Sequence, residues 1–67
     1  MNPCPYAVYW RYRGNDRVMI AKFYQLDLAA DFAAMHARYR HYNGFGPGSV
    51  TVVYSRGVIR KIKVAER

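Results

Sequence analysis

Residues 27–44 read DLAADFAAMHARYRHYNG, and this stretch decides the expected fold. Its large apolar residues recur every three or four positions, the period of one face of a helix, and the alanines between them favour helix. The apolar stripe consists of Leu28, Phe32, Met35, Tyr39 and Tyr42. We therefore expect a helix over residues 28–42, capped by Asp27 and ended by Asn43 and Gly44.

Alternating aromatic and β-branched residues before the helix predict a first β-hairpin. Its strands cover residues 6–13 and 17–24, and residues 14–15 form a tight turn between them. In the expected register Trp10 lies opposite Met19, and the apolar faces of the two strands then coincide.

A second hairpin is expected after the helix and a glycine-rich connector. Its strands cover residues 49–54 and 58–64. A three-residue loop with Gly57 in the left-handed conformation joins them, so that Tyr54 faces Val58. This register leaves one face of the hairpin mostly apolar and the other partly basic.

The element order strand, strand, helix, strand, strand predicts an α+β fold. Its economical form is a four-stranded antiparallel sheet with the single helix packed on one face, where the apolar stripe of the helix meets the sheet. Residues 1–67 would form this one basic domain, with flexible ends at residues 1–4 and 65–67. The pattern leaves the strand order open.

The short length and the cysteine count limit how such a fold is stabilised. A chain of 67 residues buries only about 60% of the surface of its unfolded form, so its stability is expected to be marginal. Cys4 is the single cysteine, and no Cys and His cluster has metal-ligand spacing, so we expect neither an intramolecular disulfide nor a metal or cofactor. Self-association as a homodimer would compensate for a thin core.

The charge of the chain is the main indication of function. Its 11 Lys and Arg against 4 Asp and Glu give a net charge of +7, and no acidic residue lies between Asp31 and Glu66. Such a surface attracts polyanions, and arginine in particular suits phosphate groups. We expect a nucleic-acid-binding protein, for DNA or RNA, although solubility alone is a simpler use of the same charge.

One helix cannot cover both faces of a four-stranded sheet, so the second face is expected to be open. Aromatic residues with cations around them resemble, in their physics, the platforms on which unstacked bases lie. The candidate nucleic-acid-binding residues are Tyr9, Arg11, Arg13, Lys22, Lys61 and Lys63 on this face and its rim, and Arg38, Arg40, Arg56 and Arg60 elsewhere. For the arginines near the helix end, complementation of the helix dipole is the favoured explanation, and contact with a nucleic acid is the alternative.

The same face also carries apolar residues that a second copy or a partner protein would cover. This predicted partner face consists of Tyr9, Val18, Ile20, Tyr24, Val53 and Ile59. It supports a second hypothesis, in which the protein is a small adaptor or inhibitor of the phage type. Such a protein would dock on an acidic surface of a larger host protein of nucleic-acid metabolism.

Catalysis and membrane insertion are not expected. His36 and His41 have no partner at a spacing suited to general acid–base or nucleophilic chemistry, so we expect no enzyme activity. No apolar run approaches the ~18 residues of a transmembrane helix, and the N-terminal residues lack the pattern of a secretion signal. The expectation is a soluble, cytoplasmic protein that does not bind membranes.

Overall fold

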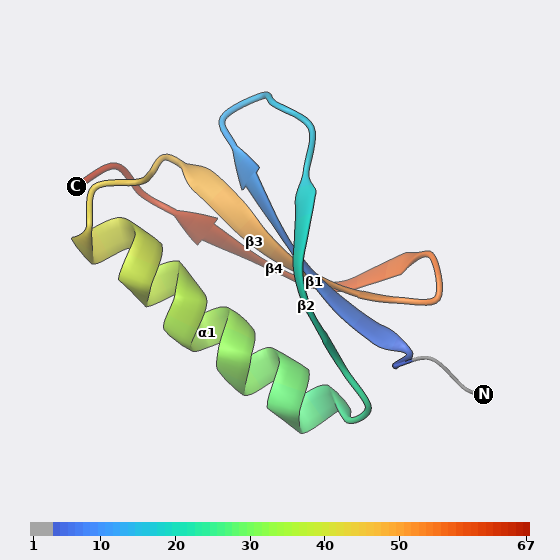
Figure 1. Cartoon of the computed structure of the whole chain (residues 1–67). Coiled ribbons are helices and arrows are strands. Elements are labelled where there is room, and N and C mark those ends of the chain that lie inside the picture. The colour runs from blue at the N-terminus through green and yellow to red at the C-terminus, as the bar shows by residue number, and fades with distance from the viewer. Residues whose placement is uncertain (1–3) are drawn as a thin grey trace.

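Two β-hairpins and one helix make up residues 4–67, the part of the chain that the computed structural model describes (Figure 1). Strands β1 (Tyr6–Tyr12) and β2 (Val18–Phe23) precede helix α1 (Leu26–Tyr42), and strands β3 (Gly48–Tyr54) and β4 (Gly57–Val64) follow it. The predicted α+β order is confirmed, and every predicted element is present. The expected flexibility of residues 1–3 lies outside the described residues. No helix within that part is long and apolar enough to cross a bilayer.

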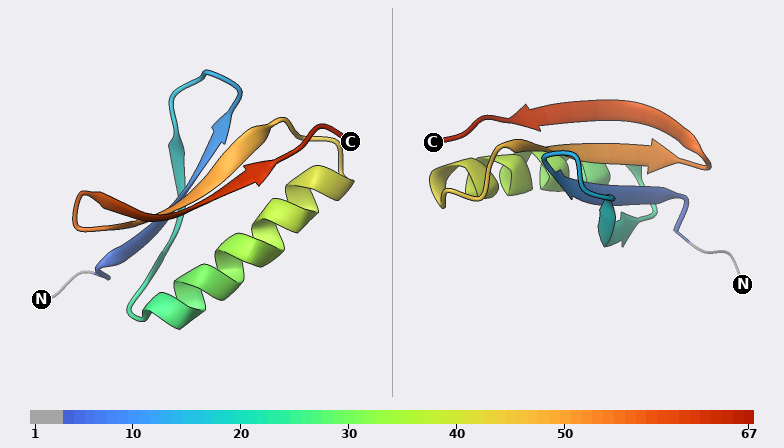
Figure 2. Two further views of the ribbon diagram at one scale, coloured as in Figure 1. Left: turned by 180° about the vertical axis from the view of Figure 1, so that it is seen from behind. Right: turned by 90° about the horizontal axis from the view of Figure 1, so that it is seen from above.

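All four strands belong to one antiparallel sheet, in the order β2-β1-β3-β4. The two hairpins therefore join through their first strands, and β1 and β3 occupy the middle of the sheet. Their pairing runs from Tyr6 opposite Tyr54 to Tyr12 opposite Gly48. Figure 2 shows the strands in this order from above, with α1 along one face only.

The core lies between α1 and the two central strands. Its largest fully buried side chains are Val8, Val50 and Val52, and the Trp10 ring is also buried. The helix adds only small side chains to this core: Ala29, Ala33 and Ala37. Because alanine ends at Cβ, the helix backbone can lie close to the sheet, and the valines and Trp10 fill the space between.

The predicted core face of the helix is wrong. Within the stripe that was expected to meet the sheet, most residues have 49% to 63% of their surface exposed: Leu28, Met35, Tyr39 and Tyr42. Only Phe32 is partly buried, with its ring centroid 5.3 Å from that of Phe23. The alanines that face the core lie on the opposite side of the helix and have the same period, so the period alone could not identify the buried stripe.

A β-bulge changes the register of the first hairpin. The predicted pairing holds as far as Val8 opposite Ala21, and beyond it Trp10 pairs with Val18 and not with Met19. A bulge adds one residue to one strand, so every residue past it changes face.

This bulge moves three residues of β2 away from their expected faces. Met19 pairs with Tyr9, on the face that the helix leaves uncovered. Val18 now lies on the helix side, and Ile20 packs against the core. We expected Val18 and Ile20 on the uncovered face, and the structure corrects both placements.

The turn of the second hairpin also differs from the prediction. Ser55, with a φ of 56°, is the left-handed residue, whereas Gly57 begins β4 and pairs with Tyr54. Val58 consequently pairs with Val53 and not with Tyr54. A register shift between Val52 and Val53 restores the expected pairing, which holds from Arg60 to the end of β4.

The C-terminal end of α1 is a Schellman motif, as the sequence predicted. Gly44 has a φ of 75°, and its N–H donates to the carbonyl of His41 at 3.2 Å. The N–H of Phe45 donates to the carbonyl of Arg40 at 2.9 Å. These two bonds satisfy carbonyls that a helix end would otherwise leave unpaired.

The predicted cap at the other end is wrong. The N-cap residue is Gln25, which makes no side-chain capping bond. Asp27 lies inside the first turn, where its Oδ1 accepts a hydrogen bond from the N–H of Leu28 at 2.9 Å. Its negative charge still complements the positive end of the helix dipole.

Gly48 begins β3 where the Trp10 ring lies close to the backbone. A Cβ at this position would lie 2.6 Å from Cη2 of Trp10 and would also collide with the carbonyl oxygen of Arg11. We expect G48A to lower the free energy of unfolding by about 1 to 3 kcal/mol, because the buried Trp10 ring and the backbone of β1 at Arg11 are both held by their surroundings and cannot make room for the added methyl group. Urea denaturation measures the loss.

The matched control is G14A, since no atom lies within 4 Å of a Cβ at Gly14. It should change stability much less than G48A. Equal losses in the two variants would contradict the close packing of Trp10 over Gly48.

Candidate nucleic-acid interface

The face of the sheet that α1 does not cover is called here the open face. Alternation along β1, β3 and β4 places on it Ala7, Tyr9, Arg11, Ser49, Thr51, Val53, Lys61 and Lys63. None of the four strands, all within residues 4–67, contains an aspartate or a glutamate. The ionisable groups that the strands present on this face are therefore mainly cationic.

The strand register arranges these residues in rows across the sheet. In one row Arg11 of β1 and Lys63 of β4 are paired on either side of Ser49 in β3. In the next row Thr51 of β3 lies between Tyr9 of β1 and Lys61 of β4. Two residues of a strand separate the rows by about 7 Å.

Two hydroxyl residues form the floor between these cations. Ser49 and Thr51 are each only 8% exposed, although no secondary-structure element covers the open face. Both belong to β3, which has a paired strand on either side, and the residues next to them on those strands have long side chains. Above the floor lies a hollow of about 480 Å³, with Arg11, Lys61 and Lys63 among its lining residues.

The loop between β1 and β2 adds two more arginines to this surface: Arg13 lines the same hollow, and Arg17 lines a smaller hollow of about 160 Å³ that shares Arg11, Ser49 and Lys61 with it. The loop spans residues 13–17 and replaces the predicted two-residue turn. Arg13 has a φ of 55°, and its N–H donates to the carbonyl of Pro47 at 3.1 Å, which holds the loop against the connector. The guanidinium carbon of Arg17 lies 4.4 Å from the centroid of the Tyr9 ring.

We call this arrangement the cationic groove: Arg11, Arg13, Arg17, Ser49, Thr51, Lys61 and Lys63. Arg17 covers one face of the Tyr9 ring through a cation–π contact. A base could stack on that face only after Arg17 had moved. The groove is therefore suited to recognise phosphate charge first and base surface second.

The groove collects part of the predicted nucleic-acid-binding set, namely Arg11, Arg13, Lys61 and Lys63, and Tyr9 lies beside it in contact with Arg17. Other members lie elsewhere. Lys22 pairs with Ala7, on the open face but towards the opposite end of the strands. Arg56 belongs to the turn between β3 and β4, and Arg60 pairs with Val52 and so lies on the helix side of β4.

Arg40, also in the predicted set, makes contacts within the fold. Its guanidinium carbon lies 4.5 Å from the centroid of the Trp10 ring and 5.3 Å from that of Phe45. Its Nε–H donates to Nε2 of His36 at 2.9 Å. Arg40 thus covers the core at the C-terminal end of α1, away from the groove.

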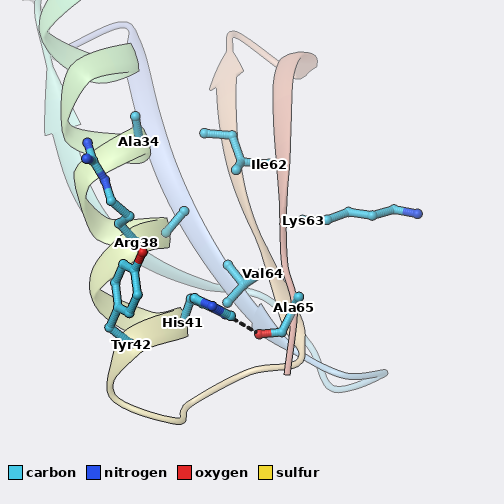
Figure 3. Close-up of a pocket in the computed structure, with 9 residues that line it drawn as sticks. Ala34, Arg38, His41, Tyr42, Ile62, Lys63, Val64 and Ala65 are labelled. Carbon is cyan, nitrogen blue, oxygen red and sulfur yellow. Dashed lines mark hydrogen bonds between the residues drawn. The ribbon is translucent and has the colours of Figure 1, made fainter. Parts of the chain in front are cut away.

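A second hollow, of about 370 Å³, lies between α1 and β4 (Figure 3). Arg38, the last member of the predicted set, lines it from the helix, whereas Lys63 points away from it. His41 Nδ1 donates to the carbonyl of Ala65 at 2.9 Å, and Arg67 donates to the carbonyl of Tyr42. These contacts connect residues 65–67, which we expected to be flexible, with α1.

The predicted partner face does not form one surface. Val18 and Ile20 lie on the helix side or against the core, and Val53, on the open face, is only 6% exposed. Tyr24 and Ile59 are exposed but belong to opposite edges of the sheet, after β2 and within β4. Among the described elements, α1 carries the largest group of exposed apolar residues: Leu26, Leu28, Met35, Tyr39 and Tyr42.

Sequence reasoning missed three groove residues. Arg17 was assigned to the start of a strand, and only the wider loop places it beside Tyr9. Ser49 and Thr51 alternate with buried valines in β3, which is the usual signal for a polar face of a strand. The predicted register of the second hairpin already places Thr51 on the face of Lys61 and Lys63, although neither hydroxyl residue was among the candidate site residues, and extending the alternation by two positions adds Ser49 to that face.

The hydrogen bond that His36 accepts from Arg40 requires the neutral form of its ring. Its Nε2 accepts the hydrogen bond from Arg40, so its proton is on Nδ1, and its ring stacks on Phe32 with 5.5 Å between centroids. Burial and, to a smaller degree, the positive charge of Arg40 lower the pKa of His36 below its ordinary value of 6.5. Protonation of His36 would break this hydrogen bond, because Nε2 would then carry a proton and could no longer accept from the Nε–H of Arg40.

This lowered pKa predicts a loss of stability in mild acid. Below about pH 6.5 the unfolded chain takes up a proton at His36 before the folded chain does, so the stabilisation is complete above that pH and decreases below it. We expect H36Q, whose amide oxygen can still accept from Arg40, to lose less stability than the wild type between about pH 7.5 and pH 5. Thermal unfolding across this range measures the difference, and identical pH slopes for the two proteins would contradict the assignment.

No three His, Cys, Asp or Glu side chains among residues 4–67 are placed to hold a metal ion. Comparisons of the chain with family models, with curated proteins and with solved structures found no match. The charge and geometry of this chain are therefore the basis on which its function is inferred.

Proposed function

We propose that the cationic groove binds the phosphate backbone of a nucleic acid, DNA or RNA. One observation carries the proposal: arginines and lysines from β1, β4 and the loop at residues 13–17 converge around Ser49 and Thr51, on a sheet whose strands have no carboxylate. The proposed role is binding alone, without catalysis.

The chemistry of the groove fits phosphate. Arginine offers several N–H donors in a planar fork, lysine adds a compact charge, and hydroxyl groups supply further donors. Lys61 and Lys63 lie on the same face, about 7 Å apart along β4. This distance is comparable with the separation of successive phosphates in an extended strand, so one strand could contact both lysines.

The position of the cations argues against a role in solubility alone. Charge that only prevents association works best when it is spread over the surface with both signs mixed. Here Arg11, Lys61 and Lys63 converge on one hollow. An acidic protein surface is the alternative ligand, and in that case a nucleic acid would bind only weakly and lose its binding at physiological salt.

A pair of neighbouring residues in β4 offers a matched test. Lys61 lies in the groove, whereas Arg60 lies on the helix side of the same strand. We expect K61A and R11A each to weaken binding for all sequences and to reduce the slope of log K against log salt by about one, because each removes one phosphate contact. R60A removes the same charge and should change both quantities less.

Fluorescence anisotropy with labelled single- and double-stranded DNA and RNA, at two salt concentrations, measures affinity and slope. If K61A and R60A reduce binding equally, the groove is not the site and net charge alone explains the affinity. If the wild type binds only at low salt and without selectivity, the acidic protein surface becomes the better hypothesis.

A further inference from the structure

The most regular apolar pattern of the chain lies on the side of α1 that faces away from the sheet. This outer stripe consists of Leu28, Phe32, Met35, Tyr39 and Tyr42. Its members are alternately four and three residues apart, which is the spacing of the a and d positions in a coiled coil. Four of its members are exposed, and only Phe32 is partly buried, where it contacts Phe23 of β2 beside the N-terminal half of the helix (Figure 1).

The stripe is exposed and yet well supported. Phe32 contacts Phe23 and stacks on His36, which in turn contacts Tyr39, with centroid distances of 5.3, 5.5 and 5.8 Å. The Tyr39 ring also lies 5.9 Å from that of Phe45. This series of rings holds two stripe residues in place before any partner arrives, so binding there would cost little side-chain entropy.

The charges beside the stripe have opposite signs at its two ends. Asp31 directly precedes Phe32, and Arg38 directly precedes Tyr39, so both occupy the same flank of the stripe, one heptad apart. Two copies of one position on this flank face each other when two such helices pack antiparallel. If Met35 lies at the twofold axis, Asp31 of one copy is level with Tyr39 of the other copy. Asp31 is then close to Arg38, which directly precedes Tyr39.

A parallel pair would lack this complementarity. It would place Asp31 and Arg38 opposite His36 and Asn43 of the other copy, and it would bring the like-charged ends of the two helices together. The antiparallel pair instead forms two symmetric ion pairs. It also sets Leu28 of each copy beside Tyr42 of the other.

We propose that a second copy of this chain docks on the outer stripe, with the two α1 helices antiparallel and Met35 at the twofold axis. One chain supplies both halves of the Asp31 and Arg38 pair, as an isologous interface requires. The cationic grooves would then face outward from opposite sides, which keeps the repulsion between two highly basic chains small. The core of residues 4–67 is thin, with Val8, Val50 and Val52 as its largest fully buried side chains, so additional burial at a dimer interface would stabilise the fold.

Sedimentation equilibrium of the full chain, without nucleic acid, tests the proposal. The wild type should show a monomer–dimer equilibrium, and M35E should be monomeric because it would place two like charges at the twofold axis. D31R and R38D should each raise the dimer dissociation constant about tenfold, since both ion pairs become repulsive at once. The double variant D31R/R38D should restore dimerisation.

The control is R56D, which makes the same charge change as R38D in the turn between β3 and β4, away from α1. It should leave the dissociation constant close to that of the wild type, and circular dichroism should show every variant folded. A wild type that stays monomeric at millimolar concentration, or a dimer that M35E does not weaken, would overturn the proposal. Failure of the double variant to recover would overturn the antiparallel arrangement.

Discussion

Close packing of the alanine side of α1 against the sheet sets most other features of this structure. Ala29, Ala33 and Ala37 let the helix lie close to the strands, where Val8, Val50, Val52 and Val64 fill the remaining space. Because these contacts use the small side chains of the helix, its large apolar side chains have to face outward. The small core and the exposed apolar surface of the helix thus have the same cause, because the helix packs on the sheet through its alanines.

The strand order has an equally direct effect on the open face. The hairpins join through β1 and β3, so β3 lies between β1 and β4. Arg11 and Lys63, far apart in the sequence, consequently flank Ser49 in one row. A sheet joined through other strands would have the same net charge without this convergence.

The two faces of the molecule have different chemistry. The open face is cationic and hydroxyl-rich, and the outer side of α1 is apolar with one acidic and one basic flank residue. Arg40 lies between them, since it contacts Trp10 in the sheet and His36 in the helix. Under our two proposals the first face binds phosphate and the second binds another copy, so that one dimer would present two grooves pointing in opposite directions.

Local sequence is enough to predict the element order, the helix end at Asn43 and Gly44 and the concentration of positive charge in the C-terminal half. Each of these depends on residues that are close neighbours in the chain. Tertiary packing sets the strand order, the bulge that moves Ile20, and the loop that brings Arg17 to Tyr9. It also decides which of two helix stripes with the same period faces the sheet, because that choice depends on how closely distant segments can pack, which no local pattern records.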